Sequence, residues 1–124
     1  MVKFYECKHC GQIIEMVNNS DVPVTCCGEQ MVEMVPNTSD GAGEKHVPVV
    51  TVDGSTVKVN VGEVDHPMTE AHYIPWIVVE TCCGVYRKNL KPGDAPTATF
   101  EIGGMKAKAV YAYCNLHGLW KTEL

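Results

Sequence analysis

Most of the chain after residue 45 alternates hydrophobic and polar residues with a period of two. Between residues 57 and 61, for example, valines alternate with Lys58 and Asn60, which places the valines on one face of an extended strand. The pair Asp53-Gly54 before this segment is typical of a two-residue hairpin turn. On these grounds we expect strands at residues 47–52, 55–61, 73–80, 84–90, 97–102 and 105–113.

These segments predict an all-β fold for the greater part of the chain. Turn-forming residues separate them at intervals of about eight to twelve residues, and no segment has a convincing amphipathic-helix pattern. Short strands at this spacing are typical of an antiparallel β-sandwich of the immunoglobulin-like type. We therefore expect two facing sheets around one core in this part of the chain.

Residues 1–36 show no such alternation, and their apolar runs are too short for more than strand fragments. A segment of this length rarely builds a stable hydrophobic core, so it needs a metal ion, disulfides or a partner. Small and turn-forming residues follow in PNTSDGAGE, at 36–44, which we interpret as a linker. The pattern predicts two domains, residues 1–36 and residues 37–124, of which the first is nucleated by a metal.

Four cysteines of the first domain have the spacing of a metal site. Cys7 and Cys10 are separated by two residues, and the adjacent pair Cys26-Cys27 follows after fifteen more. Four thiolates form a tetrahedral site for iron or zinc. Adjacent cysteines reach one metal only where the backbone turns, which Gly28 permits. Two disulfides, or a structural zinc ion without redox function, are the alternatives.

Composition narrows the class of function. The net charge of -5, with only ten Lys and Arg residues spread along the chain, argues against general nucleic-acid binding. No apolar run approaches the roughly 18–20 residues of a membrane span, and the first residues lack the apolar run of a signal peptide. We therefore expect a cytoplasmic protein that does not bind membranes. In that compartment seven cysteines indicate metal binding or redox chemistry rather than disulfides.

A second group of possible metal ligands lies in the larger domain. Its members lie at predicted strand ends or in loops: His46, His66, His72, Cys114 and His117. A single histidine in a β-sandwich is usually a surface residue or a core residue with satisfied hydrogen bonds. Four histidines, with a cysteine three residues before the last, instead indicate a common site.

The sequences around these residues resemble those of the superoxide reductases. The similar stretches are EKHVPV at 44–49, HPMTEAHYIPWI at 66–77, LKPGDAP at 90–96 and YCNLHGLW at 113–120. The four-cysteine region resembles the desulforedoxin-like domain of the same proteins, so the whole chain is similar to their two-iron form, the desulfoferrodoxin family. The resemblance implies a catalytic iron with His46, His66, His72 and His117 in a plane and Cys114 on the axis. It also implies a second iron on the four cysteines.

The resemblance implies a specific reaction, the one-electron reduction of superoxide to hydrogen peroxide. A rubredoxin-like protein is the expected electron donor, and a homodimer is the expected assembly. The residue types agree with this reaction, because four imidazoles and one thiolate leave a sixth position of iron open to a small molecule. The thiolate also pushes electron density towards whatever binds opposite it. A rubredoxin-like electron carrier, a superoxide dismutase and a structural zinc protein are the alternatives.

Two residues beside His46 are candidates for roles in catalysis. Superoxide is an anion and the chain is acidic, so we expect Lys45 to attract it and to hold a water that supplies a proton. The resemblance implies that Glu44 occupies the sixth position of the iron in the oxidised state. Cys82 and Cys83 fall at a predicted hairpin turn, and we interpret them as incidental thiols.

Overall fold

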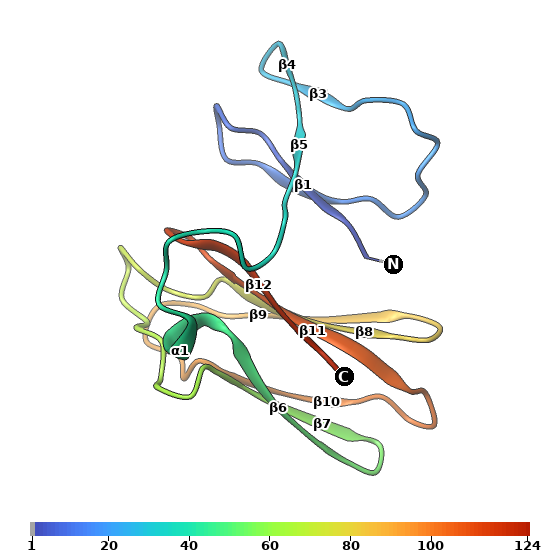
Figure 1. Ribbon diagram of the computed structural model, residues 1–124, viewed down its shortest axis with the longest axis vertical. Helices are drawn as coiled ribbons and strands as arrows, with labels where there is room; N and C mark the ends of the chain where they lie inside the picture. Colours follow the sequence, from blue (N-terminus) through green and yellow to red (C-terminus); the bar gives the residue numbers. More distant parts are fainter. Residues whose placement is uncertain (1) are drawn as a thin grey trace. The chain divides into compact units, whose positions relative to one another are not determined.

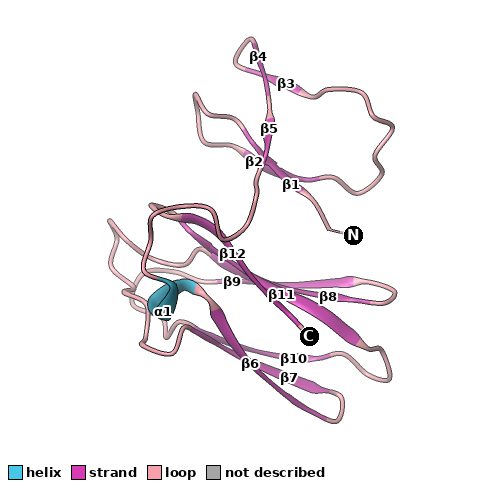
Figure 2. Ribbon diagram, viewed as in Figure 1, coloured by secondary structure: helices cyan, strands magenta, loops and turns pink. Residues whose placement is uncertain are grey.

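The computed structural model describes residues 2–124, and strands make up nearly all of their regular structure (Figures 1 and 2). Two compact units divide the chain, the first ending at Val35 and the second running from Pro36 to Leu124. The only helix within the described residues is the single turn α1 (Gly43–His46). No helix of this part of the chain is long and apolar enough to cross a membrane. The prediction of an all-β protein is confirmed.

The first unit consists of very short strands. β1 (Phe4–Glu6) lies between β2 (Ile13–Glu15) and β5 (Val32–Glu33), and both of its neighbours run antiparallel to it. A separate hairpin joins β3 (Thr25–Cys26) to β4 (Glu29–Gln30). The buried side chains in this unit are Phe4, Cys7, Met31 and Met34. So small an apolar core contributes little stability, which agrees with the expectation that the unit needs another source of cohesion.

The second unit is a sandwich of two antiparallel sheets (Figure 1). The three-stranded sheet has the order β10-β7-β6 and consists of β6 (Pro48–Asp53), β7 (Thr56–Val61) and β10 (Thr97–Glu101). The four-stranded sheet has the order β12-β11-β8-β9 and consists of β8 (Trp76–Thr81), β9 (Val85–Asn89), β11 (Ala107–Cys114) and β12 (Gly118–Glu123). The core lies between the sheets, where Val57, Val59 and Val61 are buried on one face of β7 as their alternation predicted.

Two details differ from the expectations. The first hairpin turns at Gly54-Ser55 rather than at Asp53-Gly54, because Asp53 still pairs with Thr56 and Gly54 has the positive φ of 60° that the turn requires. Strand β12 was not predicted at all. Its adjacent residues Leu119 and Trp120 are both buried, so the period of two that marks the other strands is missing.

Candidate metal centres

The possible ligands of the second unit lie in or next to the loops at one end of the sandwich, where several strands begin or end. His66 and His72 lie in the loop between β7 and β8, Cys114 is the last residue of β11, and His117 lies in the turn to β12. His46 ends α1, directly before β6. Because neighbouring strands run antiparallel, the end of β7 and the start of β6 lie together, as do the end of β11 and the starts of β8 and β12.

Four imidazole rings form a closed square, which we call the histidine square: His46, His66, His72 and His117. Ring centroids of neighbouring corners lie 4.6, 4.6, 5.1 and 4.9 Å apart going round it, and the diagonal from His46 to His72 is longer, at 6.3 Å. Neighbouring rings are nearly perpendicular, with interplanar angles of 73° to 88°. The nitrogens of His46, His66 and His117 lie closer together, at 3.0 and 3.1 Å, than their ring centroids, so these rings turn an edge towards one another.

The nitrogens that face the middle are acceptors. His46 Nδ1 lies 2.6 Å from the Ala42 carbonyl oxygen and His66 Nδ1 lies 2.7 Å from that of Pro67, so both Nδ1 atoms must carry the proton and donate it. Their Nε2 atoms then hold lone pairs, yet these two atoms lie only 3.0 Å apart. Two lone pairs aimed at each other repel unless a cation lies between them.

The spacing of these nitrogens fits a transition-metal ion. His46 Nε2 lies 3.0 Å from His66 Nε2 and 3.1 Å from His117 Nδ1. In a square with sides of this length, the centre lies about 2.1–2.2 Å from each corner, close to the length of a bond from imidazole to a first-row metal. The fourth corner fits as well, because His72 Nε2 is buried without a hydrogen-bond partner among the described residues. Such an orphaned atom costs about 1–3 kcal/mol unless something else binds it.

Cys114 supplies a fifth donor. Its side chain is fully buried, and its Sγ lies 3.8 Å from His117 Nδ1 and accepts a hydrogen bond from the His117 backbone N–H at 3.4 Å. The donor atoms of Cys114, His46, His72 and His117 all lie within 4.8 Å of one another. Burial raises the pKa of the Cys114 thiol, which the N–H groups of Leu116 and His117 oppose. A cation in the site would complete the stabilisation of the thiolate.

Three of these histidines, His46, His66 and His72, have pKa values below the ordinary one, which favours the neutral form that a metal ligand requires. Burial lowers the pKa of His66 to about 4, and it is also the main cause of the lowered pKa values of His46 and His72. The charge of Lys45 adds to the lowering at both His46 and His72, so this half-buried cation acts on two corners of the square. Glu44, by contrast, is exposed in the first turn of α1.

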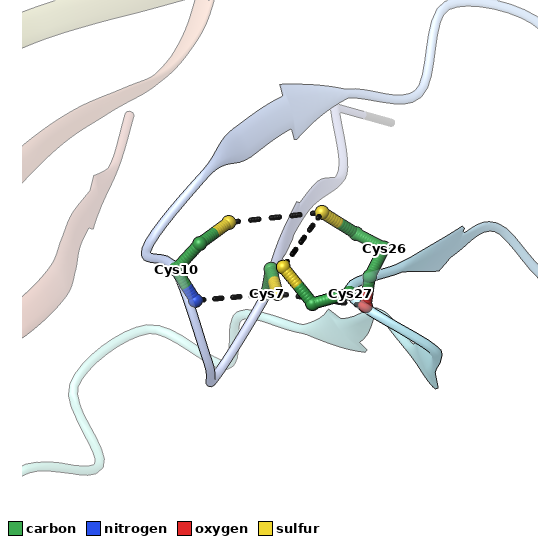
Figure 3. Close-up of side chains that lie close together, drawn as sticks. All are labelled: Cys7, Cys10, Cys26 and Cys27. Carbon is green, nitrogen blue, oxygen red and sulfur yellow. Dashed lines mark hydrogen bonds between the residues drawn. The ribbon is translucent and has the colours of Figure 1, made fainter.

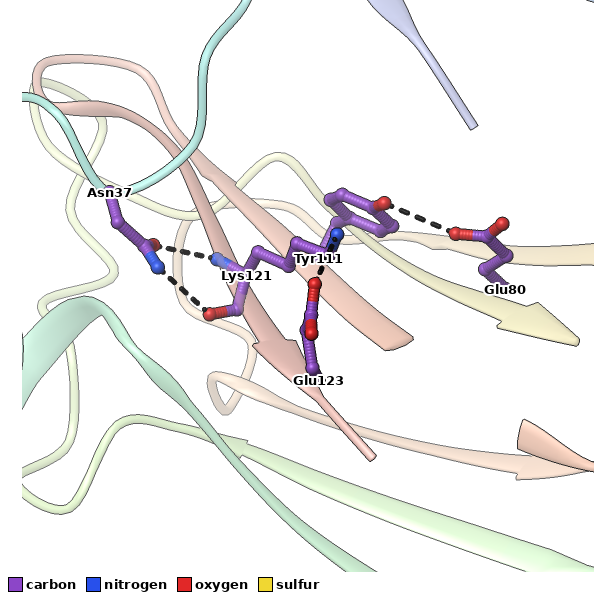
Figure 4. A network of polar contacts seen from close by, with 5 residues as sticks. All are labelled: Asn37, Glu80, Tyr111, Lys121 and Glu123. Carbon is purple, nitrogen blue, oxygen red and sulfur yellow. Dashed lines mark hydrogen bonds and ion pairs between the residues drawn. The ribbon is translucent and has the colours of Figure 1, made fainter. Parts of the chain in front are cut away.

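The segment interpreted as a linker, residues 36–44, is in fact part of the second unit and lines the histidine square. Asn37 forms two hydrogen bonds with the backbone of Lys121 in β12, at 3.2 and 2.9 Å (Figure 4). Ser39 donates a hydrogen bond to the His117 carbonyl oxygen, and Ala42 accepts one from His46. These contacts use small polar groups and backbone atoms, so hydropathy gave no sign of them.

Sequence reasoning also missed Gly41. A Cβ atom at this position would lie 2.9 Å from His117 Cβ, 3.0 Å from His46 Cε1 and 3.0 Å from Trp120 Cζ2. The Trp120 ring stacks on His46 with centroids 4.9 Å apart and an interplanar angle of 29°. The absence of a side chain at Gly41 therefore lets the loop close against two ligands and the indole that supports one of them.

The four cysteines of the first unit form a separate cluster (Figure 3). Their sulfur atoms all lie within 4.8 Å of one another, and Cys26 Sγ lies 3.7 Å from Cys10 Sγ and 3.9 Å from Cys27 Sγ. Disulfide sulfurs are about 2.05 Å apart, so these thiols are not paired. Four sulfurs bound to one metal at 2.3 Å would lie about 3.8 Å apart in a regular tetrahedron. The cluster thus has the dimensions of a tetrahedral metal site.

The backbone and the titration of these thiols agree with that assignment. Cys27 and Gly28 have φ angles of 55° and 75°, so the chain turns where two adjacent cysteines must face one point. Backbone N–H groups, chiefly that of Cys10, lower the pKa of Cys7 to about 6. Hydrogen bonding with Cys10 is the main cause that raises the pKa of Cys26 to about 12, and it raises that of Cys27 as well. Crowded thiols resist ionising together unless a cation joins them.

Comparisons with known proteins agree on one family. The family model described as Desulfoferrodoxin matches residues 38–123. The desulfoferrodoxin of Nitratidesulfovibrio vulgaris is 50% identical over 123 residues, which cover 98% of this chain and 95% of that protein. The superoxide reductase of Treponema pallidum superimposes with a TM-score of 0.82 at 35% identity, covering 99% of this chain and 98% of its own. The one-iron superoxide reductase of Giardia intestinalis gives a TM-score of 0.56 at 34% identity, covering 65% of this chain and 99% of its own.

Proposed function

The chain belongs to the desulfoferrodoxin family of superoxide reductases, and from this premise we propose that it reduces superoxide to hydrogen peroxide at the histidine square and Cys114. The observation that carries the proposal is the donor set itself. Four imidazole rings and one thiol sulfur lie together, and the nitrogen–nitrogen distances of 3.0 and 3.1 Å between neighbouring rings suit bonds to a first-row metal. When bound there, iron supplies the single electron that superoxide needs to become peroxide.

The protein residues prepare this site before any substrate arrives. The Nδ1 hydrogen bonds of His46 and His66 fix their ring orientation and leave Nε2 free as a donor. The N–H groups of Leu116 and His117 point at the Cys114 sulfur and limit how much charge the thiolate can push onto its metal. The buried rings also exclude water from the ligand set, because His46 and His66 are each only 2% exposed.

Lys45 is the proposed substrate-steering residue. The chain carries a net charge of -5, so an anionic substrate is repelled by the protein as a whole and needs a local cation. Lys45 is half-buried next to His46, and its charge lowers the pKa of two ligands of the square. In this position the ammonium group attracts superoxide and holds a water that donates a proton to the product. We assign to Glu44 a displaceable role at the open position, since it precedes Lys45 in the same helical turn.

The first unit, residues 1–36 in the proposed division, holds the second iron on Cys7, Cys10, Cys26 and Cys27. These cysteines and the histidine square with Cys114 match the two iron sites of a desulfoferrodoxin. We infer that electrons reach the enzyme from a rubredoxin-like protein. We also infer a homodimer formed through the first unit, which exposes an unusual number of apolar side chains: Val17, Val22, Val24, Val32 and Val35. The seven free cysteines favour a reducing compartment, the cytoplasm.

Metal analysis and product stoichiometry test the proposed function together. The purified protein should contain about two irons per chain, and a Cys114→Ser variant should lose the visible ferric–thiolate absorption of the second site. With a chemical reductant, each superoxide consumed should take one electron from the reductant and yield one hydrogen peroxide. Dioxygen released without a reductant would identify a dismutase instead. Iron bound only at the four cysteines, with no consumption of superoxide, would identify an electron carrier.

A further inference from the structure

Cys82 and Cys83 belong to neither metal centre, yet the fold holds their sulfur atoms together. The two residues form the turn between β8 and β9, both are exposed, and their Sγ atoms are 2.9 Å apart. Successive side chains on a regular strand point to opposite faces. Here the turn brings both thiols to the same side, so they are positioned to react with each other.

A buried threonine fixes the shape of this turn. Thr81 is only 5% exposed, and its Oγ1 donates a hydrogen bond to the Gly84 carbonyl oxygen at 2.7 Å. Thr81 Oγ1 also accepts hydrogen bonds from the backbone N–H groups of Cys83 at 3.2 Å and Gly84 at 3.0 Å. The Cys82 N–H donates to the carbonyl oxygen of Lys106 at 3.0 Å, which ties the turn to the segment that precedes β11. The two thiols therefore sit on a backbone with little freedom to separate them.

The two thiols differ in acidity. The hydrogen bond from Cys83 is the main cause that lowers the pKa of Cys82, and the backbone of Lys106 and the charge of Lys108 add to it. The pKa of Cys83 is raised, chiefly by the same hydrogen bond and by the charge of Cys82. Cys82 is thus the more acidic thiol of the pair and, at a given pH, the one with the larger thiolate fraction.

We propose that Cys82 and Cys83 are a peroxide-reactive dithiol, which closes into a disulfide and consumes hydrogen peroxide. The Cys82 sulfur attacks one peroxide oxygen, the O–O bond breaks, and a sulfenic acid forms while the departing hydroxide takes up a proton to become water. The Cys83 sulfur then attacks the Cys82 sulfur, the S–S bond forms, and the S–O bond breaks. The hydroxyl leaves as a second water with the Cys83 proton. The two thiols lose two electrons and two protons, and one peroxide becomes two waters.

The enzyme's own product is the oxidant, and in this respect the inference rests on the proposed function. The dithiol and the histidine square lie at opposite ends of β8 and β11. Thr81, next to the dithiol, pairs with Ala107 at the start of β11, whereas Cys114 is the last residue of β11. At about 3.3 Å per residue, the six residues of β8 separate the two sites by roughly 20 Å. The dithiol therefore meets peroxide that has already left the iron site through solvent.

The disulfide should be easy to reduce again. Adjacent Cα atoms are about 3.8 Å apart across a trans peptide, less than the 4.4–6.8 Å that most disulfides span. A bond closed over this distance is strained, and strained exposed disulfides have the more oxidising potentials. A dithiol reductant restores the two thiols by giving up two electrons and becoming a disulfide itself.

The chain sequence makes a direct test possible. Trypsin cleaves after Lys58 and Arg87, and the peptide from Val59 to Arg87 contains Cys82 and Cys83 as its only cysteines. The full-length, iron-loaded enzyme is reduced, treated with hydrogen peroxide and quenched with N-ethylmaleimide. We expect this peptide to appear without maleimide and two hydrogens lighter than the dithiol, and to take up two maleimides after dithiothreitol. Two free thiols after a tenfold excess of peroxide, or sulfinic acids in place of the disulfide, would overturn the inference.

Single variants assign the two roles. Cys83→Ser should stop at the sulfenic acid on Cys82, which dimedone traps, whereas Cys82→Ser should react with peroxide about tenfold more slowly at Cys83. Equal dimedone labelling of the two variants would overturn the assigned roles. Both variants should reduce superoxide at the unchanged rate, since neither thiol belongs to a metal centre.

A last arm tests the source of the oxidant. Superoxide and a reductant are supplied instead of peroxide, with and without catalase, and peroxide is measured in parallel. The disulfide should form only without catalase. Measured peroxide with an unoxidised dithiol would refute the claim that the dithiol consumes the product, while no peroxide at all would refute the proposed function. The arm with added peroxide separates these two failures, because it depends on the dithiol alone.

Discussion

A single methyl group at Gly41 should disturb the histidine square. In Gly41→Ala the new Cβ would lie 2.9–3.0 Å from His117, His46 and Trp120. Carbon atoms at rest are about 3.5–4.0 Å apart, so the loop or these rings must shift by roughly 0.5–1 Å. Overpacking of this kind costs about 1–3 kcal/mol. Because two of the three neighbours are metal ligands, iron affinity at this centre should fall by about 10- to 100-fold, as it does when supporting residues are altered.

Gly43 provides the matched control for this change. It lies two residues further on, at the start of α1, and a Cβ there would meet only Val47 Cγ2 at 3.9 Å, which is an ordinary contact. We expect Gly43→Ala to stay within about 0.5 kcal/mol of the wild type. Urea unfolding of the iron-loaded proteins gives the stability, and competition with a chelator gives the iron affinity. The steric reasoning is refuted if Gly41→Ala matches the wild type in both, or if Gly43→Ala is equally harmful.

Three further predictions concern charge, domain division and pH. Lys45→Ala should slow the reaction with superoxide about tenfold at low salt and weaken its salt dependence, whereas Lys45→Arg should preserve both; an unchanged rate in pulse radiolysis would remove Lys45 from the proposal. A chain that starts at Pro36 should keep iron at the histidine square. A chain that starts at Gly43 should lose it, because this shorter chain lacks the packed segment 36–42. Metal analysis measures the iron, and its loss from the longer chain would contradict the division into two units. Burial and the charge of Glu80 raise the pKa of Tyr111, so the stability it contributes is complete below its unfolded value of about 10 and is lost as the pH rises through the folded pKa. Tyr111→Phe should flatten this alkaline loss in urea unfolding, and equal pH slopes would show that another group causes it.

Local pattern was enough to predict most strands of the second unit. The valines of β7 alternate in burial because one face of the strand packs on the core and the other meets solvent. The same logic failed for β12, where Leu119 and Trp120 are buried side by side. Adjacent burial removes the alternation, so the strand is recognisable only from its pairing with β11.

The candidate ligands could be named from sequence because few side chains bind iron, and the structure brings the five of them together. Their supporting residues could not be named. Gly41 acts through having no side chain, and Ala42 acts through a backbone carbonyl that accepts the His46 proton. Neither function depends on hydropathy or charge, so residues 36–44, which are mostly small, were interpreted as a linker. The sequence placed Cys82 and Cys83 at a turn, but it did not show that their sulfur atoms lie 2.9 Å apart, since the shape of this turn depends on hydrogen bonds to Thr81.

The dimensions of the histidine square have a consequence for maturation of the enzyme. Sides of 3.0–3.1 Å exclude Ca²⁺, which needs longer bonds and oxygen ligands, but they suit Zn²⁺ and Cu²⁺ as well as Fe²⁺. Nitrogen and sulfur donors bind Cu²⁺ and Zn²⁺ more tightly than Fe²⁺ in the usual order of affinities. Selection of iron thus falls to the supply of metal ions while the chain folds. Mismetallation is the expected failure during overproduction in zinc-rich medium, and its product would be folded, colourless and unable to transfer an electron.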